Sequence, residues 1–257
     1  MPRYFIEVMY KGTGYAGFQA QDNAITIQGE MERALQIYFR RKIALTCSSR
    51  TDAGVHAKQN YFHFDDCGSE IEWQSAVYHL NAILPQGIVI KGIRRVLPDA
   101  HSRFDAESRV YEYSLYVKKN PFWEDRAYYF PYRLDIHRLN EAAEILLATH
   151  DFEAFSKKNT QVKTFQCVLK ESKWGEEGER VVYRVEGNRF LRGMVRGLVG
   201  TMLRVGTGKA SLEKFREIIE SKDCRKADFS MPPEGLMLIE VRFSKKIYHQ
   251  DDRLEMQ

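Results

Sequence analysis

The sequence predicts an α/β protein of the α+β type, built from two ferredoxin-like halves with mainly antiparallel sheets. Its 257 residues are enough for two domains of ordinary size. Hydrophobic residues make up 44% and charged residues 29%, which is typical of a globular protein. The predicted elements follow the order β-α-β-β-α-β twice, which is the split βαβ pattern. We therefore expect an N-terminal domain over 1–104 and a C-terminal domain over 105–257.

In the first half, apolar residues recur first with the period of a strand and then with that of a helix. Tyr4, Ile6 and Val8 alternate with polar positions, whereas Ile27 and Met31 begin a pattern with helical spacing. The elements expected here are a strand over 3–10, a helix capped by Thr26, strands over 43–48 and 59–65, a helix over 70–83 stopped by Pro85, and a strand over 87–97.

The second half repeats this order of elements. They are a strand over 108–118, a helix capped by Asp135, strands over 164–174 and 180–187, a helix beginning near Phe190, a shorter helix over 211–221, and a strand over 236–243. The acidic run WGEEGER between the two middle strands is typical of a hairpin turn because it contains glycines. The halves share no obvious sequence repeat, so the expected duplication is one of architecture.

The composition excludes several classes of protein. No stretch approaches the roughly 18 uninterrupted apolar residues of a membrane span, and the N-terminal segment meets charges too early for a signal peptide. The net charge of +4 allows a nucleic-acid partner without requiring one. We expect a cytoplasmic protein with reduced thiols, because no C-x-x-C pair occurs among Cys47, Cys67, Cys167 and Cys224.

The segment KGTGYAGF carries Gly12, Gly14 and Gly17 in the G-x-G-x-x-G spacing directly after a strand. A dinucleotide site needs a helix that begins at the last glycine, so that its N-terminal amides face the pyrophosphate. The next helical pattern begins only near residue 26. We therefore reject a dinucleotide site and interpret the segment as a flexible loop over a site.

The segment CSSRTDAGVHA contains no large apolar residue before its valine. One interpretation is a structural turn, in which Asp52 caps its own backbone and Gly54 takes a positive φ. The other is a catalytic carboxylate at a sheet edge, because Arg50 favours the ionised form of Asp52, which suits a nucleophile. The spacing alone favours the turn. His56 is a further polar candidate, although a histidine among apolar residues is more often structural.

A basic segment without any acidic residue, GNRFLRGMVRGLVGTMLRVGTGK, spans residues 187–209. In a helix, Arg192 and Arg196 would stand one turn apart at the edge of an apolar stripe. The glycines suit either close packing on the sheet or a face that binds anions, and the pattern does not decide between them. Lys157 and Lys158 belong to another basic cluster. With Arg192, they are candidates for contacts with a nucleic-acid backbone.

Tyr111 lies on the strand predicted over 108–118, on the same face as Arg109 and Tyr113. Tyrosines on a sheet most often belong to the core. A tyrosine beside an arginine is also suited to stack on a base of a nucleic acid. Both interpretations of Tyr111 stay open.

Four motifs resemble those of the TruA family of tRNA pseudouridine synthases: SRTDAGVHA, SRVYEY, GNRFLRGMVR and PPEGL. With KGTGYAGFQ near the start, they extend the resemblance over essentially the whole chain. The R-T-D-A-G-V-H-A core is highly specific and favours the catalytic interpretation of Asp52 over the structural turn. One departure is Ser49, which stands where the family usually has glycine. We expect this change to bear on the backbone turn at Arg50 and to leave in place the side chains that the resemblance implies are catalytic.

The resemblance implies a role for five side chains. Asp52 would be the essential aspartate, and Arg50 the arginine that displaces the target base. Tyr111 would stack on the target uridine and Arg196 would pair with Asp52. Leu236 would form a wall of the pocket.

The resemblance also implies what the enzyme does. It would be a homodimer that converts uridine to pseudouridine at positions 38, 39 and 40 in the anticodon stem and loop of tRNA. Its catalysis would depend on an aspartate and need neither a cofactor nor a metal. Its fold would consist of two pseudo-symmetric α/β domains. The residues leave two routes open, namely attack of Asp52 on C1′ or removal of a C2′ proton through a glycal.

Two other functions are weaker interpretations of the sequence. An RNA-binding module without chemistry would stack bases on Tyr61 and Phe62, but the segment QNYFHF lacks the basic and glycine positions of that motif. A phosphate-handling hydrolase would need clustered carboxylates or metal-ligand spacing, and the sequence shows neither.

Overall fold

The structure is a computed structural model that describes residues 1–66, 73–158 and 162–248. Its contacts divide the chain into two compact units. The first unit holds Met1–Glu107 and the chain from Leu238 onward, and the second holds Ser108–Met237. Cys67 and the first residues of the helix expected over 70–83 lie outside the described residues.

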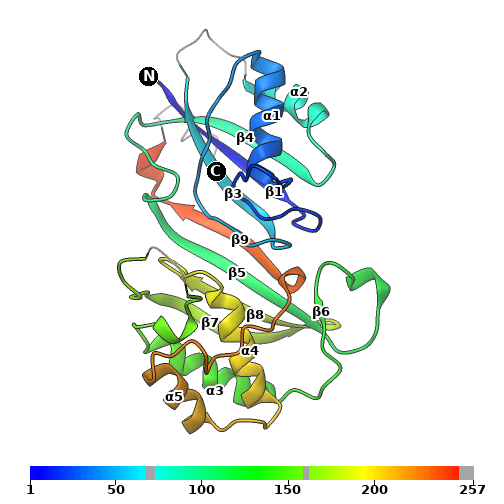
Figure 1. The fold of residues 1–257 in the computed structure, drawn as a ribbon, viewed down its shortest axis with the longest axis vertical. Helices are drawn as coiled ribbons and strands as arrows, with labels where there is room; N and C mark the ends of the chain where they lie inside the picture. The colour runs from blue at the N-terminus through cyan, green and yellow to red at the C-terminus, as the bar shows by residue number, and fades with distance from the viewer. Residues whose placement is uncertain (67–72, 159–161, 249–257) are drawn as a thin grey trace. The chain divides into compact units, whose positions relative to one another are not determined.

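The first unit follows the expected order of elements (Figure 1). They are β1 (Arg3–Tyr10), α1 (Ile27–Phe39), β2 (Thr46–Cys47), β3 (His56–Asp65), α2 (Trp73–Ile83) and β4 (Ile88–Val96). The Thr26 hydroxyl caps α1 as predicted, because it accepts a hydrogen bond from the amide of Gly29 at 3.1 Å. Helix α2 ends before Pro85, which disfavours helical geometry in the preceding residue.

The sheet of the first unit has the order β4-β1-β3, and β2 pairs with β3. Every one of these pairs is antiparallel. This is the strand arrangement of a split βαβ unit, in which the third strand lies between the first and the second. Ile6 and Val8 are fully buried, and the ring of Phe62 stacks on that of Phe18 with centroids 4.7 Å apart. The core of the unit therefore lies on the sheet face that carries these residues.

The strand predicted over 43–48 is much shorter, since β2 holds only Thr46–Cys47. The backbone of Leu45 is bonded to side chains of α1 instead of a neighbouring strand. Its amide donates to the Glu32 carboxylate at 3.1 Å, and its carbonyl accepts from the Gln28 amide at 3.0 Å. Strand β3, in contrast, begins three residues before the predicted position 59.

The described residues of the second unit form further strands and helices (Figure 1). The strands and helices are β5 (Ala106–Tyr116), β6 (Tyr128–Tyr129), α3 (Ile136–Leu147), β7 (Leu169–Glu177), β8 (Arg180–Gly187), α4 (Met194–Gly206), α5 (Leu212–Glu220) and the start of β9 (Leu236–Phe243). Short 3-10 turns lie at Pro121–Trp123, Glu153–Phe155 and Pro233–Gly235, and a fourth, Lys245–Ile247, lies in the first unit. Asp135 caps α3 as predicted, with its carboxylate accepting from the amide of Arg138 at 3.1 Å.

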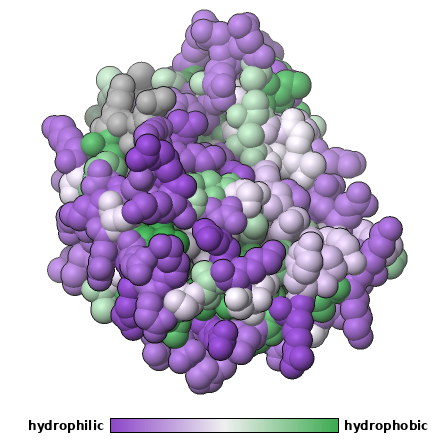
Figure 2. All heavy atoms as spheres, turned by 60° about the horizontal axis from the view of Figure 1, so that its bottom comes forward, coloured by the Kyte–Doolittle hydropathy of each residue, from purple (hydrophilic) through white to green (hydrophobic). Residues whose placement is uncertain are grey.

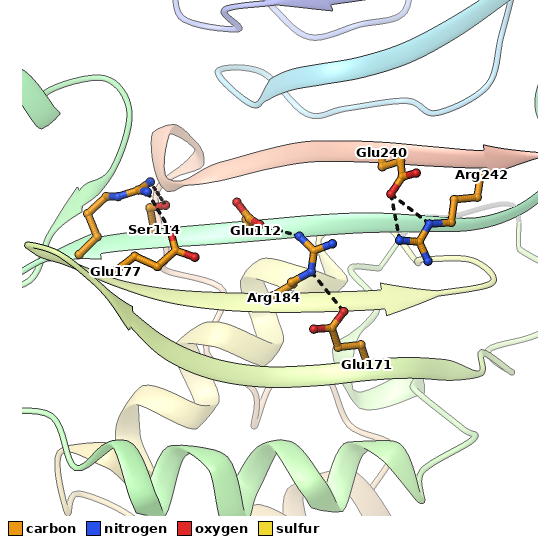
Figure 3. A network of polar contacts seen from close by, with 8 residues as sticks. Glu112, Ser114, Glu171, Glu177, Arg184, Glu240 and Arg242 are labelled. Atoms are coloured by element: carbon orange, nitrogen blue, oxygen red, sulfur yellow. Dashed lines mark hydrogen bonds and ion pairs between the residues drawn. The ribbon is translucent and has the colours of Figure 1, made fainter. Parts of the chain in front are cut away.

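The strands of the second unit have the order β5-β8-β7 and are antiparallel, whereas β6 pairs with β5 in parallel. One face carries the buried rings of Tyr113, Tyr183 and Trp174. On the other face, Arg184 of β8 binds both neighbouring strands (Figure 3). Its Nη1 donates to Glu112 at 2.7 Å and its Nε to Glu171 at 3.2 Å. Charged pairs across strands help to fix their register.

The strand expected over 164–174 begins later, at Leu169. The preceding backbone is bonded to the segment after α3, because the carbonyl of Phe165 accepts from Phe152 at 3.1 Å and the amide of Cys167 donates to His150 at 2.9 Å. The predicted hairpin is present, and its turn is at Gly178, whose φ is 61°.

The helix expected to begin near Phe190 begins at Met194. Gly193 precedes it with a φ of 73°, a left-handed conformation that glycine adopts readily and that does not continue a helix toward the N-terminus. The glycines of α4 serve close packing. A Cβ on Gly197 would lie 2.7 Å from the ring of Phe229, and one on Gly200 would lie 2.4 Å from the carbonyl oxygen of Asp228. The chain at residues 228–229 therefore lies directly on the helix.

Hydrophilic residues cover most of the face drawn in Figure 2, and hydrophobic residues show only in small separate patches. Within the described ranges, no helix combines the length and apolar character needed to span a membrane. Cys47 and Cys167 are buried free thiols. Burial raises the pKa of the Cys167 thiol to about 11.

The chain between β2 and β3, residues 48–55, is called here the Asp52 loop. It lies against the glycine loop, residues 11–18, which follows β1. A Cβ on Gly12 would lie 2.1 Å from the carbonyl oxygen of Val55. The glycine spacing after β1 therefore allows two backbones to approach each other closely, which is a different role from that in a dinucleotide site.

The other end of the glycine loop is also in contact with the Asp52 loop. Gly17 has a φ of 112°, and a Cβ on it would lie 3.3 Å from the carbonyl oxygen of Thr51. That same carbonyl accepts a hydrogen bond from the amide of Phe18 at 3.1 Å. The glycine loop is thus in contact with the Asp52 loop at both of its ends.

We predict that Gly12→Ala destabilises the protein by about 1–3 kcal/mol, because the new methyl group would force apart two backbones that cannot repack like side chains. Gly92→Ala is the matched control, since no atom lies within 4 Å of the added Cβ, and it should change stability by about 0.5 kcal/mol or less. Urea unfolding followed by circular dichroism measures both. Equal midpoints for the two variants would show that the approach of the two loops is not tight.

Candidate active site

Asp52 lies in a turn that is closed by its own backbone. Its carbonyl accepts a hydrogen bond from the amide of Val55 at 3.2 Å, and Gly54 has a φ of 79°. The predicted turn is therefore present, and it leaves the side chain of Asp52 half-buried and that of Arg50 exposed. The structural turn and a functional carboxylate are compatible, because the backbone makes the turn and the carboxylate extends from it.

The residues before Asp52 are held by buried polar side chains of β1 and β3. The hydroxyls of Tyr10 and Thr51 lie 2.8 Å apart. The side-chain amide of Asn60 donates to the carbonyl of Ser49 at 2.8 Å and to the Tyr10 hydroxyl at 3.2 Å. The segment that leads into Asp52 is thus bound at Ser49 through its carbonyl and at Thr51 through its side chain.

His56 is buried at the start of β3 and binds the glycine loop. Its Nδ1 accepts a hydrogen bond from the amide of Gly12 at 3.0 Å. Because that nitrogen accepts, the neutral ring carries its proton on Nε2. The structural interpretation of this histidine is therefore supported, since it joins the strand to the loop that packs on Asp52.

Tyr111 lies on β5, opposite Val185 of β8, and is 9% exposed. Its ring meets that of Phe190 edge to face, with centroids 5.0 Å apart and planes at 78°. Such a pair is favourable beyond the area that it buries, and it fixes the orientation of the tyrosine ring. Tyr111 is therefore packed in the core of its unit, and its ring is also an aromatic surface of fixed orientation.

Arg196 lies in the first turn of α4 and is half-buried. Its Nε donates to the carbonyl of Met231 at 2.5 Å, which holds the guanidinium in place. Tyr113 lies nearby and donates to the carbonyl of Pro232 at 2.8 Å. Burial raises the pKa of this tyrosine, Glu234 raises it further, and the Arg196 guanidinium lowers it. The arginine is thus oriented by the segment before the PPEGL motif.

Leu236 is the first residue of β9 and is 7% exposed. It follows the 3-10 turn Pro233–Gly235, and a Cβ on Gly235 would lie 2.6 Å from the ring of Tyr113. The PPEGL motif therefore packs on the strand that also carries Tyr111.

The expected position of Arg192 on a helix, one turn from Arg196, is wrong. Arg192 is exposed in the turn before α4, and its carbonyl accepts from the amide of Lys157 at 3.0 Å. The Nζ of Lys157 lies 6.0 Å from the centroid of the Phe229 ring, within range of a cation–π contact. Lys158 is exposed. Three basic residues therefore gather close to the N-terminal end of α4.

The candidate residues fall into two groups. Asp52 and Arg50 share one loop of the first unit, where His56 also lies, and the other candidates lie in the second unit. Sequence reasoning missed Tyr10, Asn60 and Met231. For Asn60 a signal was present, since it is a polar residue in a row of β3 where Phe62 and Phe64 are apolar.

A metal site does not emerge from the described part of the chain, where no three His, Cys, Asp or Glu residues are grouped so that they could hold an ion. The first unit offers a carboxylate and a guanidinium group on one loop, and the second unit offers a guanidinium group and a fixed aromatic ring.

Comparison with known proteins identifies the family. The model of a tRNA pseudouridine synthase family matches residues 142–244. The tRNA pseudouridine synthase A of Parabacteroides distasonis is 40% identical over 259 residues, which cover 98% of this chain and 100% of that protein. The enzyme of the same name from Bacteroides fragilis is 42% identical over 247 residues, which cover 96% and 98%. That from Porphyromonas gingivalis is 41% identical over 252 residues, which cover 96% and 100%. These matches extend over both units, and the chain is therefore a pseudouridine synthase, an intramolecular isomerase, that belongs to the tRNA pseudouridine synthase A family.

Proposed function

We propose that this enzyme converts uridine to pseudouridine at positions 38, 39 and 40 in the anticodon stem and loop of tRNA, with Asp52 as its catalytic residue. The observation that carries the proposal is the Asp52 loop, in which the specific R-T-D-A-G-V-H-A motif holds a half-buried carboxylate on an anchored backbone. Family membership supports the tRNA substrate.

The reaction breaks the bond between N1 and C1′, turns the freed uracil, and joins C5 to C1′. It needs a carboxylate at C1′, a positive charge that keeps this carboxylate ionised, and a surface that holds the loose base. Asp52, Arg196 and Tyr111 supply these in turn. Leu236 forms a wall of the pocket. No redox change occurs, and the proton lost from C5 balances the one gained at N1.

The target base has to leave its stack before Asp52 can act at C1′, which costs a few kcal/mol. Arg50 supports this step because its exposed guanidinium stands two residues from the carboxylate. Contacts with phosphates offset the cost. Arg192, Lys157 and Lys158 are our candidates for these contacts, because they gather near one end of α4.

The same proposal includes the assembly of the protein. We propose that the enzyme is a cytoplasmic homodimer, and that an N-terminal domain over 1–104 and a C-terminal domain over 105–257 are related by pseudo-symmetry. The repeated β-α-β-β order supports the internal relation, since β1-β3-β2 and β5-β8-β7 follow the same arrangement.

We predict that Asp52→Asn lowers the rate of pseudouridine formation to below a few per cent of wild type, while the affinity for tRNA stays within a few-fold. The amide keeps the shape of the side chain but removes the charge needed at C1′. Chemical labelling of pseudouridine in a tRNA transcript measures the rate. A variant that retains substantial activity would remove Asp52 from catalysis. A wild-type protein that makes no pseudouridine would leave only RNA binding.

For Arg196, we predict that Arg196→Lys substantially lowers the single-turnover rate and that Arg196→Ala lowers it further. Lysine keeps the charge but loses the planar group that donates to Met231. Saturating enzyme isolates the chemical step, and thermal unfolding controls for folding. Wild-type rates in both folded variants would mean that Arg196 serves packing alone.

Arg192→Ala and Lys158→Ala should weaken tRNA binding modestly, without changing the single-turnover rate at saturation. Each phosphate contact contributes roughly −0.7 to −0.9 to the slope of log K against log salt, so each variant should flatten this slope by about one. Glu144→Gln is the control, as an exposed carboxylate that the proposal does not use. If the slope of log K against log salt is unchanged in both Arg192→Ala and Lys158→Ala, these two residues do not contact the phosphates of the tRNA.

A further inference from the structure

We propose that Tyr10 and Asn60 are positioning residues for catalysis: through buried hydrogen bonds they set where the carboxylate of Asp52 stands. Neither residue is among those that the family resemblance assigns. The inference rests on the proposed role of Asp52 and adds a set of groups that act through the loop rather than on the substrate.

Asn60 is a polar residue in an apolar row. Along β3, it shares a face with Phe62 and Phe64, and it pairs with Val8 of β1. All of these side chains are buried, and Asn60 is 0% exposed. An amide at such a position costs free energy unless its polar atoms are bonded. An aliphatic residue would be the expected choice for packing, so a reason beyond packing is needed.

The bonds of Asn60 show what this reason is. Its Nδ2 donates to the carbonyl of Ser49 at 2.8 Å and to the Tyr10 hydroxyl at 3.2 Å. Its Oδ1 accepts from the amide of Tyr61 at 2.9 Å. A carbonyl can only accept, so the bond to Ser49 fixes which end of the amide faces the loop. The side-chain NH2 group of Asn60 therefore donates one hydrogen bond to the Asp52 loop, at Ser49, and one to Tyr10, which itself contacts that loop.

Tyr10 extends this connection to the residue next to Asp52. The hydroxyl of Tyr10 lies 2.8 Å from Oγ1 of Thr51, and Tyr10 is only 5% exposed. The register between β1 and β3 shifts between Val8 and Tyr10, so that Tyr10 pairs with Ala57. Such a bulge changes the direction in which side chains at the end of a strand point.

Thr51 is therefore held in two ways. Its side chain meets Tyr10, and its carbonyl accepts from the amide of Phe18. With Thr51 fixed and the carbonyl of Asp52 bonded to Val55, little freedom remains for the backbone of Asp52. A misplacement of a catalytic group by about 1 Å can cost roughly a hundredfold in rate. A small displacement of this backbone is therefore enough to matter.

The test uses Tyr10→Phe and Thr51→Val, which keep the shape of each side chain and remove one hydroxyl. We expect each to lower the single-turnover rate by roughly tenfold to a hundredfold, with the dissociation constant for tRNA unchanged within about twofold. Because the two hydroxyls form one contact, the double variant should lose little more than either single variant. Thr51→Ser keeps the hydroxyl and should retain most of the rate.

The matched control is Tyr183→Phe. Tyr183 is likewise a buried tyrosine, and its hydroxyl lies 2.9 Å from that of Ser172, in the core of the second unit. This variant should lose a similar amount of stability to Tyr10→Phe and keep the wild-type rate. A thermal unfolding curve for each variant establishes that the kinetic assays compare folded proteins.

The inference fails if Tyr10→Phe has the wild-type single-turnover rate, or if Tyr183→Phe loses as much rate as Tyr10→Phe does. It also fails if tRNA affinity accounts for the whole loss. These outcomes leave the proposed function intact. A fully active Asp52→Asn variant, in contrast, would overturn the proposed function whatever the Tyr10 variants do.

Discussion

The close approach of two backbones, at Gly12 and at the carbonyl of Val55, is the constraint on which the site depends. A side chain at either of the contacting glycines would separate the glycine loop from the Asp52 loop. The hydrogen bonds between Gly12 and His56 and between Phe18 and Thr51 are possible only at this separation. The main-chain contacts thus set how closely the two loops pack, and the side chains of Tyr10 and Asn60 hold the residues before Asp52.

The second unit holds its candidate groups by a different means. Arg196 is oriented by a backbone carbonyl of the segment before β9, and Tyr111 by the edge of a neighbouring ring. Each of these two side chains is therefore held by a contact within its own unit. The glycines of α4 let residues 228–229 lie on the helix, and the chain then leads to Met231, which accepts from the arginine.

Periodicity predicted most of the elements, because the alternation in β1 and the spacing in α1 are clear. It failed where backbone groups bond outside the sheet. Leu45 looks like a strand residue, but side chains of α1 bind its amide and carbonyl. Arg192 looks helical by spacing, but Gly193 takes a left-handed conformation and α4 begins after it.

The site was predictable in part for similar reasons. The Asp52 motif was visible because its residues are contiguous in the sequence. The contacts of Tyr10 and Asn60 were not, since they join positions that are 41 and 11 residues away from their partners. Periodicity describes which face a residue occupies, and it carries no information about such partners.

The separation between β1 and the Asp52 loop also affects when the site forms during folding. Helix α1 and its cap depend on neighbours in sequence, so they can form early. The contact of Tyr10 with Thr51 closes a much longer stretch of chain, and it needs β1 paired with β3. Closing such a loop costs entropy before any contact compensates for it. The Asp52 loop is therefore ordered late, and a chain that has formed its helices but not this strand pair has secondary structure without an ordered Asp52 loop.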